Sequence, residues 1–276
     1  MASGTPIYQP IQGHFLAHSL LLESLDDDAF TRSLSAARVD MNPHQVEASL
    51  FALKSPLNKG VLLADEVGLG KTIEAGLVMA QKWAEQKRKI LLIVPASLRK
   101  QWEQELIEKF GLKSTIMEAG KHREMKKSGI HDPFDKASGV VISSYEFAAR
   151  QKDELQRTKW DLVVFDEAHR LRNVYKKNGS QRAKDLRRAL ADPIKVLLTA
   201  TPLQNSLLEL FGIVSIIDET HFGGEAAFKR QYMGAGASLA SAEALKDRLK
   251  PICHRTLRRQ VQEAGHINFT KRNATV

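Results

Sequence analysis

The sequence predicts an α/β fold in which a mainly parallel sheet carries helices on both faces. Short apolar runs alternate with segments of helical period along most of the chain. Glycine-rich or polar motifs directly follow several of these runs, and ligands bind at such strand ends in parallel sheets. The runs expected to form strands are 61–64, 90–94, 114–117, 139–143, 162–165 and 196–198.

Length and composition are those of an ordinary globular protein. The 276 residues are 43% hydrophobic and 26% charged, enough for one large domain or two small ones. No apolar run reaches the length of a membrane span, and the nine histidines show no zinc-ligand spacing. The single Cys253 excludes an internal disulfide and suits a reducing compartment, so we expect a cytoplasmic protein, associated with the nucleoid if it is bacterial. The net charge of +9 permits a polyanionic partner without requiring one.

The run 61–64 leads into the glycine-rich loop DEVGLGKT and then into a segment of helical period. A strand, a glycine-rich turn and a helix N-terminus form the layout of a phosphate-binding loop. Backbone N–H groups at Gly68 and Gly70 could approach a polyphosphate, Lys71 would reach the β- and γ-phosphates, and the Thr72 hydroxyl would help to hold Mg²⁺. The full pattern has glycine where this chain has Asp65. The predicted nucleotide-binding residues of the loop are Asp65, Glu66, Val67, Gly68, Leu69, Gly70, Lys71 and Thr72.

A helix is predicted upstream of the loop, beginning at Asn42-Pro43. It carries Gln45, whose side-chain amide has the donor and the acceptor needed to read an adenine edge. An exposed helical glutamine with no such role is the simpler interpretation of this residue when it is taken alone.

An acidic pair follows the run 162–165, in the sequence DEAH. Asp166 would hold Mg²⁺ together with Thr72, and Glu167 would orient and deprotonate an attacking water. A carboxylate placed for water favours hydrolysis over phosphate transfer to another substrate. Lys71, Asp166 and Glu167 are therefore the predicted catalytic residues. The same tetrapeptide, taken alone, could be no more than a strand end and a helix cap.

The ordered motifs DEVGLGKT, DEAH and LLTATPLQN resemble motifs I, II and III of superfamily-two helicase-like ATPases. More narrowly, they resemble the Swi/Snf-type branch, bacterial members included. NPHQVEA is similar to the adenine-recognition segment of that branch, IVPASLRKQWEQE to its motif Ia, and ISSYEF to its next nucleic-acid-contacting motif. Motif I of the family has aspartate at the position of Asp65. The resemblance spans about residues 41–260.

The resemblance implies a RecA-like lobe that binds ATP and Mg²⁺ and tracks along duplex DNA, without strong sequence preference and usually without separating the strands. It implies that Thr199 and Thr201 couple the ATP site to DNA, although a Thr-Pro turn would explain them equally. Four further residues would lie near a DNA backbone, where small polar side chains and strand-end amides suit phosphate. Each of these four is more simply a strand-end cap: Pro95, Ser97, Ser143 and Ser144.

We expect a helical N-terminal extension over residues 1–40, the RecA-like lobe over 41–250, and an exit segment over 251–276. The exit segment contains LRRQ and would lead to a second RecA-like lobe, whose arginines complete the ATP site in the family. We therefore expect this chain to bind nucleotide but to turn it over slowly or not at all. Residues 121–136 are expected to form a surface connection, and 225–250 a helix interrupted by glycines.

Three alternatives remain at this point. The chain could be a nucleotide-gated module that binds DNA or protein and is never a motor, or part of a strand-separating helicase. A metabolic kinase with a phosphate-binding loop is a weaker alternative, because it leaves the DEAH and TATP motifs unexplained.

Overall fold

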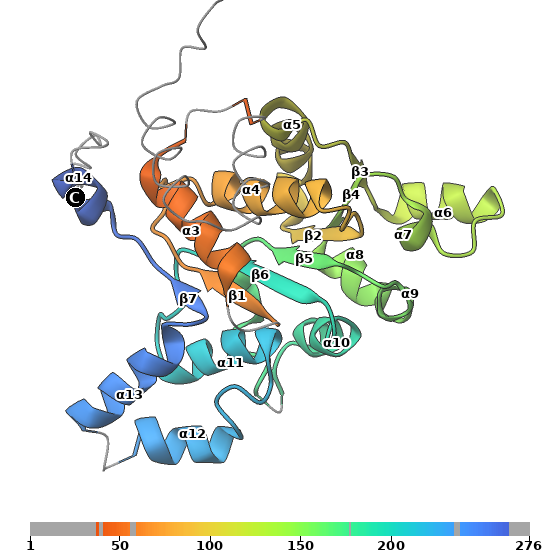
Figure 1. Cartoon of the computed structure of the whole chain (residues 1–276). Helices are drawn as coiled ribbons and strands as arrows, with labels where there is room; N and C mark the ends of the chain where they lie inside the picture. Colours follow the sequence, from red (N-terminus) through yellow and green to blue (C-terminus); the bar gives the residue numbers. More distant parts are fainter. Residues whose placement is uncertain (1–36, 39–40, 56–58, 177, 235–237, 265–276) are drawn as a thin grey trace, which may run out of the picture.

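A seven-stranded sheet forms the centre of the computed structural model, which describes residues 37–38, 41–55, 59–176, 178–234 and 238–264. The strand order is β3-β4-β2-β5-β6-β1-β7, and every pairing is parallel (Figure 1). The predicted fold class is confirmed, and the six predicted runs correspond to β1 to β6. The strands are β1 (Gly60–Leu63), β2 (Ile90–Val94), β3 (Ser114–Ile116), β4 (Val140–Ser144), β5 (Leu162–Phe165), β6 (Ile194–Leu198) and β7 (Cys253–His254).

Helices cover both faces of the sheet (Figure 1). One face carries α3 (Pro43–Lys54), α4 (Lys71–Ala84) and α5 (Arg99–Phe110). The other carries α8 (Tyr145–Arg150), α9 (Lys152–Arg157), α10 (Gln181–Ala189) and α11 (Leu207–Ile217). Beyond α11 lie α12 (Glu225–Tyr232) and α13 (Leu239–Leu249). Two 3₁₀ turns, η1 (Ala96–Leu98) and η2 (Ala168–Leu171), follow strands β2 and β5.

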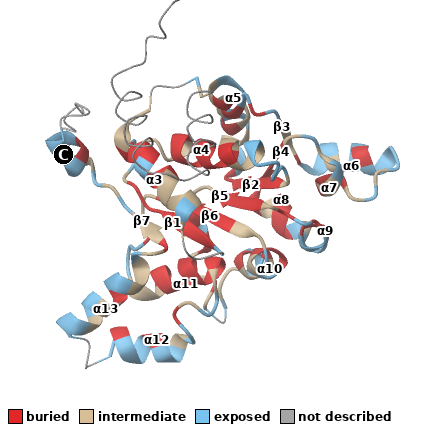
Figure 2. Cartoon of the chain, viewed as in Figure 1, coloured by how far each residue is buried: buried red, intermediate tan, exposed pale blue. Residues whose placement is uncertain are grey.

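The central strands are buried on both faces, as Figure 2 shows for β2, β5 and β6. Successive side chains of a strand point to opposite faces of a sheet. Leu62 therefore packs into the core under α11, whereas Leu63 packs into the core under α3 and α4. Burial on both faces explains why these strands read as unbroken apolar runs and not as an alternating pattern.

The strand order places the three motif-bearing strand ends side by side. Strand β6 lies between β5 and β1, with Leu197 opposite Phe165 and Leu198 opposite Leu63. The glycine-rich loop follows β1, the acidic pair follows β5, and Thr199 follows β6 directly. Because all three strands are parallel, these segments emerge at one edge of the sheet.

One expectation about local structure was wrong. Residues 121–136 are not a plain connection, because they contain most of α6 (Ala119–Lys127) and all of α7 (Pro133–Lys136), which project beyond β3 (Figure 1). Phe134 is fully buried there, with its ring centroid 6.1 Å from that of Phe147. The apolar residues of this segment are too sparse to show a helical period, so only their tertiary contacts reveal the helices. The exit segment also adds a strand, β7, which pairs with β1, and a last helix, α14 (Arg258–Glu263).

The predicted helix over residues 225–250 is divided into α12 and α13. The expected helical extension over 1–40 lies almost entirely outside the described residues. Within the part of the chain that the structure describes, no helix has the length and apolar character needed to cross a bilayer.

Candidate nucleotide site

The glycine-rich loop adopts a conformation that requires its glycines. Gly68 has φ 84° and Gly70 has φ 92°, values that side chains of L-residues rarely tolerate. A Cβ atom at Gly70 would lie 2.2 Å from Gln45 Nε2, and one at Gly68 would lie 2.7 Å from Arg258 Nη2. The glycines thus let Gln45 and Arg258 approach the loop backbone closely, and α4 begins directly after the loop at Lys71.

Lys71 is held at the base of the loop. Its Nζ donates to the carbonyl oxygens of Asp65 at 2.7 Å and Glu66 at 3.2 Å, which uses two of the three ammonium N–H groups. Burial lowers the pKa of Lys71, while the charges of four carboxylates raise it: Glu74, Asp65, Glu167 and Asp166. The predicted lysine and the predicted acidic pair therefore lie within electrostatic reach of each other.

Gln45 supports the loop from α3. Its Nε2 donates to the Leu69 carbonyl oxygen at 2.9 Å, and its Oε1 accepts from the Asn42 backbone at 3.0 Å. His44 Nε2 lies 2.9 Å from the same Leu69 oxygen. Both ends of the Gln45 amide are thus engaged within the protein, and a role in reading adenine remains a prediction.

The Asp166 carboxylate is held by two donors. Its Oδ1 accepts from the Glu167 backbone at 2.8 Å, and its Oδ2 accepts from Trp102 Nε1 at 2.8 Å. Burial raises the pKa of Asp166, and the hydrogen bond from Trp102 opposes that rise. In the sequence, Trp102 belongs to IVPASLRKQWEQE, and no role at the site is predicted for it. Its indole N–H was the missed signal, since a buried tryptophan needs a hydrogen-bond acceptor.

Glu167 is positioned by backbone strain and by a histidine. Its φ of 53° is unusual for a residue other than glycine and is typical of functional sites. Its Oε2 lies 3.0 Å from His169 Nδ1, and this hydrogen bond holds the pKa of Glu167 below its ordinary value. Glu167 is therefore a carboxylate at neutral pH, which is the form that can accept a proton from water.

Thr199 connects the acidic pair to the glycine-rich loop. Its Oγ1 lies 3.5 Å from His169 Nδ1 and accepts from the Thr201 backbone at 3.2 Å. Its own backbone N–H donates to Leu63, at the end of β1, at 3.1 Å. The two predicted coupling threonines thus lie where a movement of the acidic pair would reach them, and their coupling role remains a prediction.

A buried carboxyl pair lies under the loop. Asp65 and Glu74 are both fully buried, and burial, together with the charge of Asp65, raises the pKa of Glu74 to about 9. Glu74 is therefore protonated at neutral pH. Neither oxygen of Glu74 has a hydrogen-bond partner among the described residues, nor does Asp65 Oδ2.

The four predicted nucleic-acid contacts have different surroundings. Ser143 is buried, and its hydroxyl donates to the Met117 carbonyl oxygen at 3.1 Å. Ser144 caps α8 by accepting from the Phe147 backbone at 3.2 Å. Pro95 is buried, whereas Ser97 is exposed in η1. The hydroxyls of both buried serines thus form hydrogen bonds within the protein, and Ser97 is the exposed residue of the four.

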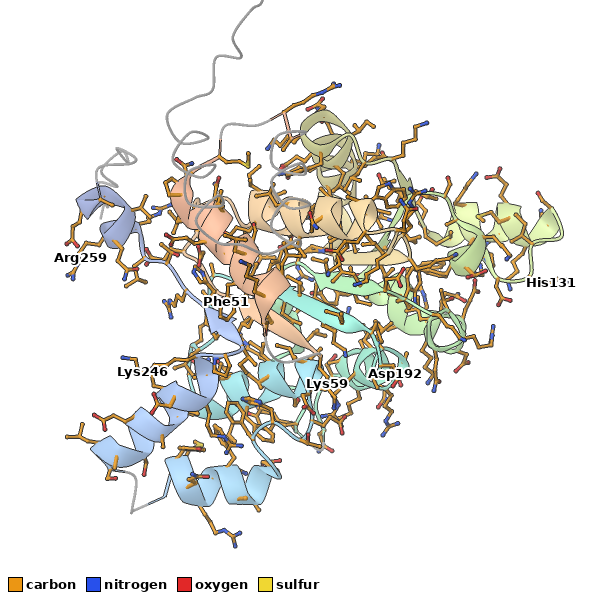
Figure 3. All side chains as sticks on the ribbon, viewed as in Figure 1. Phe51, Lys59, His131, Asp192, Lys246 and Arg259 are labelled. Atoms are coloured by element: carbon orange, nitrogen blue, oxygen red, sulfur yellow. The ribbon has the colours of Figure 1, made fainter. Side chains whose placement is uncertain are left out.

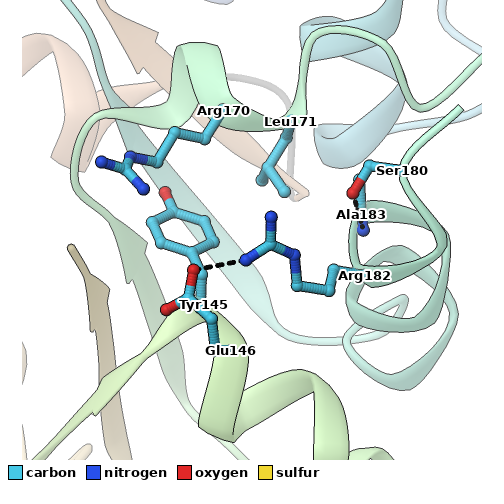
Figure 4. A pocket seen from close by; sticks show the side chains of 7 residues that line it. All are labelled: Tyr145, Glu146, Arg170, Leu171, Ser180, Arg182 and Ala183. Carbon is cyan, nitrogen blue, oxygen red and sulfur yellow. Dashed lines mark hydrogen bonds and ion pairs between the residues drawn. The ribbon is translucent and has the colours of Figure 1, made fainter. Parts of the chain in front are cut away.

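A small pocket of about 160 Å³ lies between the end of β4 and the acidic segment (Figure 4). The Tyr145 hydroxyl beside it donates to the Asp166 carbonyl oxygen at 2.6 Å, so the β4 end is tied to the acidic pair. Arg170 and Arg182 also line this pocket, and Arg182 pairs with Glu146 (Figure 4). The lining thus contains two arginines, one of them paired with a carboxylate.

Comparison with known proteins decides the family. The model of the SNF2-related domain matches residues 44–275. The chain belongs to the SNF2-related family. It is 36% identical over 219 residues to a Bacillus subtilis (strain 168) protein named "Uncharacterized ATP-dependent helicase YqhH". The aligned region is 78% of this chain and 36% of that protein. The resemblance seen in the motifs is confirmed.

The fold is similar to that of the Sulfolobus solfataricus SWI2/SNF2 ATPase core, solved in complex with dsDNA. The TM-score is 0.66 at 24% sequence identity, over 81% of this chain and 46% of that one. This likeness supports the RecA-like lobe as a fold. The chain spans little more than a third of the bacterial relative and less than half of the archaeal structure.

The donor set at the site fits Mg²⁺. Thr72 offers a hydroxyl oxygen and Asp166 a carboxylate, and Mg²⁺ prefers one or two carboxylates completed by water and phosphate oxygens. Among the described residues, no cluster of three or more histidine, cysteine or acidic side chains could hold a metal ion. When a nucleotide is bound, its phosphate oxygens and water would complete the coordination of the ion.

We expect Trp102→Phe to weaken Mg²⁺-dependent nucleotide binding by roughly threefold to tenfold, because Asp166 Oδ2 loses its donor while an aromatic ring is kept in the core. Titration of a fluorescent nucleotide at several Mg²⁺ concentrations measures this effect. Trp160→Phe is the matched control, since it removes an indole bond to the Leu155 carbonyl oxygen instead of one to the acidic pair. Equal effects of the two substitutions on nucleotide binding would contradict the assignment.

We expect the free energy of unfolding to fall between about pH 4.5 and 9 in part because of Glu74, at up to about 1.4 kcal/mol per pH unit. The native state keeps a proton on this group that the unfolded state releases above its ordinary pKa. Glu74→Gln cannot lose that proton, so its denaturation midpoint should depend less on pH and exceed that of the wild type under alkaline conditions. Glu47→Gln, at an exposed position of α3, is the control. A Glu74→Gln profile parallel to that of the wild type would refute the protonated state.

Proposed function

We propose that this chain is the ATP-binding lobe of a DNA-dependent ATPase that moves along duplex DNA. The observation that carries the proposal is the convergence of Lys71, the Asp166-Glu167 pair and Thr199 at one edge of a parallel sheet. Family membership supports the same class of activity.

The proposed roles follow from the contacts. Loop amides and Lys71 bind the phosphates, while Thr72 and Asp166 hold Mg²⁺. When bound, Mg²⁺ neutralises the charge that develops on the transferred phosphoryl group. Glu167 orients a water and takes its proton, because its contact with His169 keeps it ionised. A second RecA-like lobe, in the same chain or another, would supply arginines to the phosphates and allow rapid turnover.

Duplex DNA is the proposed partner at the strand-end edge. The net charge of +9 and the arginines beside the β4 end support binding to a phosphate backbone. Ser97, exposed after β2, is the predicted contact with the most accessible side chain.

Lys71→Ala should abolish binding of Mg²⁺-ATP, whereas Glu167→Gln should leave binding within about twofold and stop hydrolysis. Fluorescent-nucleotide titration of this chain measures binding. Phosphate release by a protein that also contains the second lobe measures hydrolysis. Lys82→Ala, on the same helix α4, is the control. Normal turnover by Glu167→Gln would remove the general-base role, and nucleotide binding by Lys71→Ala would remove the phosphate loop.

DNA affinity should fall by at least roughly tenfold between about 50 and 200 mM salt and should vary little with sequence, because phosphate contacts release counterions. Fluorescence anisotropy with two unrelated duplexes measures both properties. A flat salt dependence would exclude the DNA role for this lobe. Strand displacement by the two-lobed protein would instead identify a helicase, and ATP-dependent binding without movement would identify a gated binding module.

A further inference from the structure

The chain after β7 lies directly against the glycine-rich loop. Strand β7 pairs with β1, with Cys253 opposite Leu62 and His254 opposite Leu63. Beyond the strand, the chain passes the loop and enters α14, on the same side of the molecule as α3 (Figure 1). We call residues 254–258 the clamp segment.

Hydrogen bonds join the clamp segment to the chain over residues 64–67. Three run between main-chain or carboxylate groups near the strand end: Ala64 N to His254 O at 2.7 Å, Thr256 N to Asp65 Oδ1 at 2.7 Å, and Glu66 N to Thr256 O at 3.2 Å. Two involve Arg258, whose backbone N–H donates to Glu66 Oε2 at 2.6 Å and whose Nε donates to Val67 O at 2.8 Å. The loop is thus bonded along its first half to a segment about 190 residues away in sequence.

The Arg258 guanidinium lies against Gly68, on the side where any other residue would carry a side chain. A Cβ at Gly68 would lie 2.7 Å from Arg258 Nη2, so the guanidinium occupies the space beside this glycine. Its Nε is used by Val67 O, and the positive charge lies beside backbone groups predicted to meet a polyphosphate. A guanidinium suits phosphate oxygens in both charge and geometry.

The far end of the clamp segment is anchored independently of Arg258. The His254 ring lies 5.5 Å from that of Phe51 on α3, and its Nδ1 lies 3.3 Å from Asp65 Oδ1. His254 and Thr256 also line a pocket of about 330 Å³ whose other wall includes His44 of α3. The clamp segment therefore connects the loop with the helix that carries Gln45.

Resting on the proposed function, we propose that the clamp segment is part of the nucleotide site. Arg258 holds the loop in its phosphate-binding form and adds positive charge beside the phosphates of a nucleoside triphosphate. The hydrogen bonds at Asp65 and Glu66 make the position of the clamp segment depend on the loop. Because the loop and the clamp segment share these bonds, a change in the loop on nucleotide binding must either break them or move the chain that follows β7.

The first test compares Arg258→Ala with Arg259→Ala. Arg259 lies on the outer side of α14, with a side chain that is 84% exposed and paired with Glu263 (Figure 3). In titrations of the chain with a fluorescent ATP analogue and Mg²⁺, Arg258→Ala should weaken binding by at least about fivefold, and Arg259→Ala by less than about twofold. Arg258→Lys keeps the charge without Nε and should lie between wild type and Arg258→Ala. Wild-type affinity in Arg258→Ala would overturn the role of Arg258.

The second test is hydrogen exchange with and without the same nucleotide. Amides of 254–258 should exchange more slowly when nucleotide binds, in step with those of 65–72, and Arg258→Ala should reduce this protection. Protection confined to 65–72 would overturn the linkage between loop and clamp segment. The outcomes also separate this inference from the proposed function: if the wild type binds no nucleotide in either assay, the proposed function fails, and if it binds but Arg258→Ala behaves as wild type, only this inference fails.

Discussion

The buried carboxylate of Asp65 is the contact on which the nucleotide site depends. One oxygen accepts the Thr256 backbone N–H, and the charge of the carboxylate helps to raise the pKa of the buried Glu74. The backbone carbonyl of the same residue accepts from Lys71. A glycine at this position, as in the full phosphate-loop pattern, would provide the carbonyl but not the carboxylate. Compared with glycine, Asp65 has less backbone freedom but forms a hydrogen bond with the chain that follows β7.

Protonation of Glu74 makes this arrangement compatible with a polyphosphate. Four carboxylates lie within electrostatic reach of Lys71, and a fully ionised set would repel an anionic ligand. With its pKa raised to about 9, Glu74 is neutral at physiological pH and adds no negative charge under the loop. The remaining carboxylates, Asp166 and Glu167, are those to which metal and water chemistry are assigned.

A continuous set of contacts crosses the strand-end edge. It runs from Trp102 on α5 through Asp166 and Glu167 to His169 and Thr199, and so to the end of β1. Tyr145 joins the same set from the end of β4. The end of β4, where DNA contacts are proposed, and the segments proposed to bind ATP are therefore joined by hydrogen bonds along one edge of the sheet.

The sequence by itself determined the parallel α/β architecture, six of the seven strands, and the loop and DEAH residues, because these depend on local apolar runs and short motifs. Tertiary structure alone decided the partners of those residues. No local pattern shows that Trp102 donates to Asp166 or that Thr256 and Arg258 bond to the glycine-rich loop. Nor does any pattern show that Cys253 and His254 form the strand β7. These contacts join segments 64 to 191 residues apart. A single side chain or a two-residue strand has no sequence periodicity from which such a contact could be predicted. The physical reason is that a motif determines its own backbone conformation through local residues. Its hydrogen-bond partners depend on how the whole sheet and its helices pack.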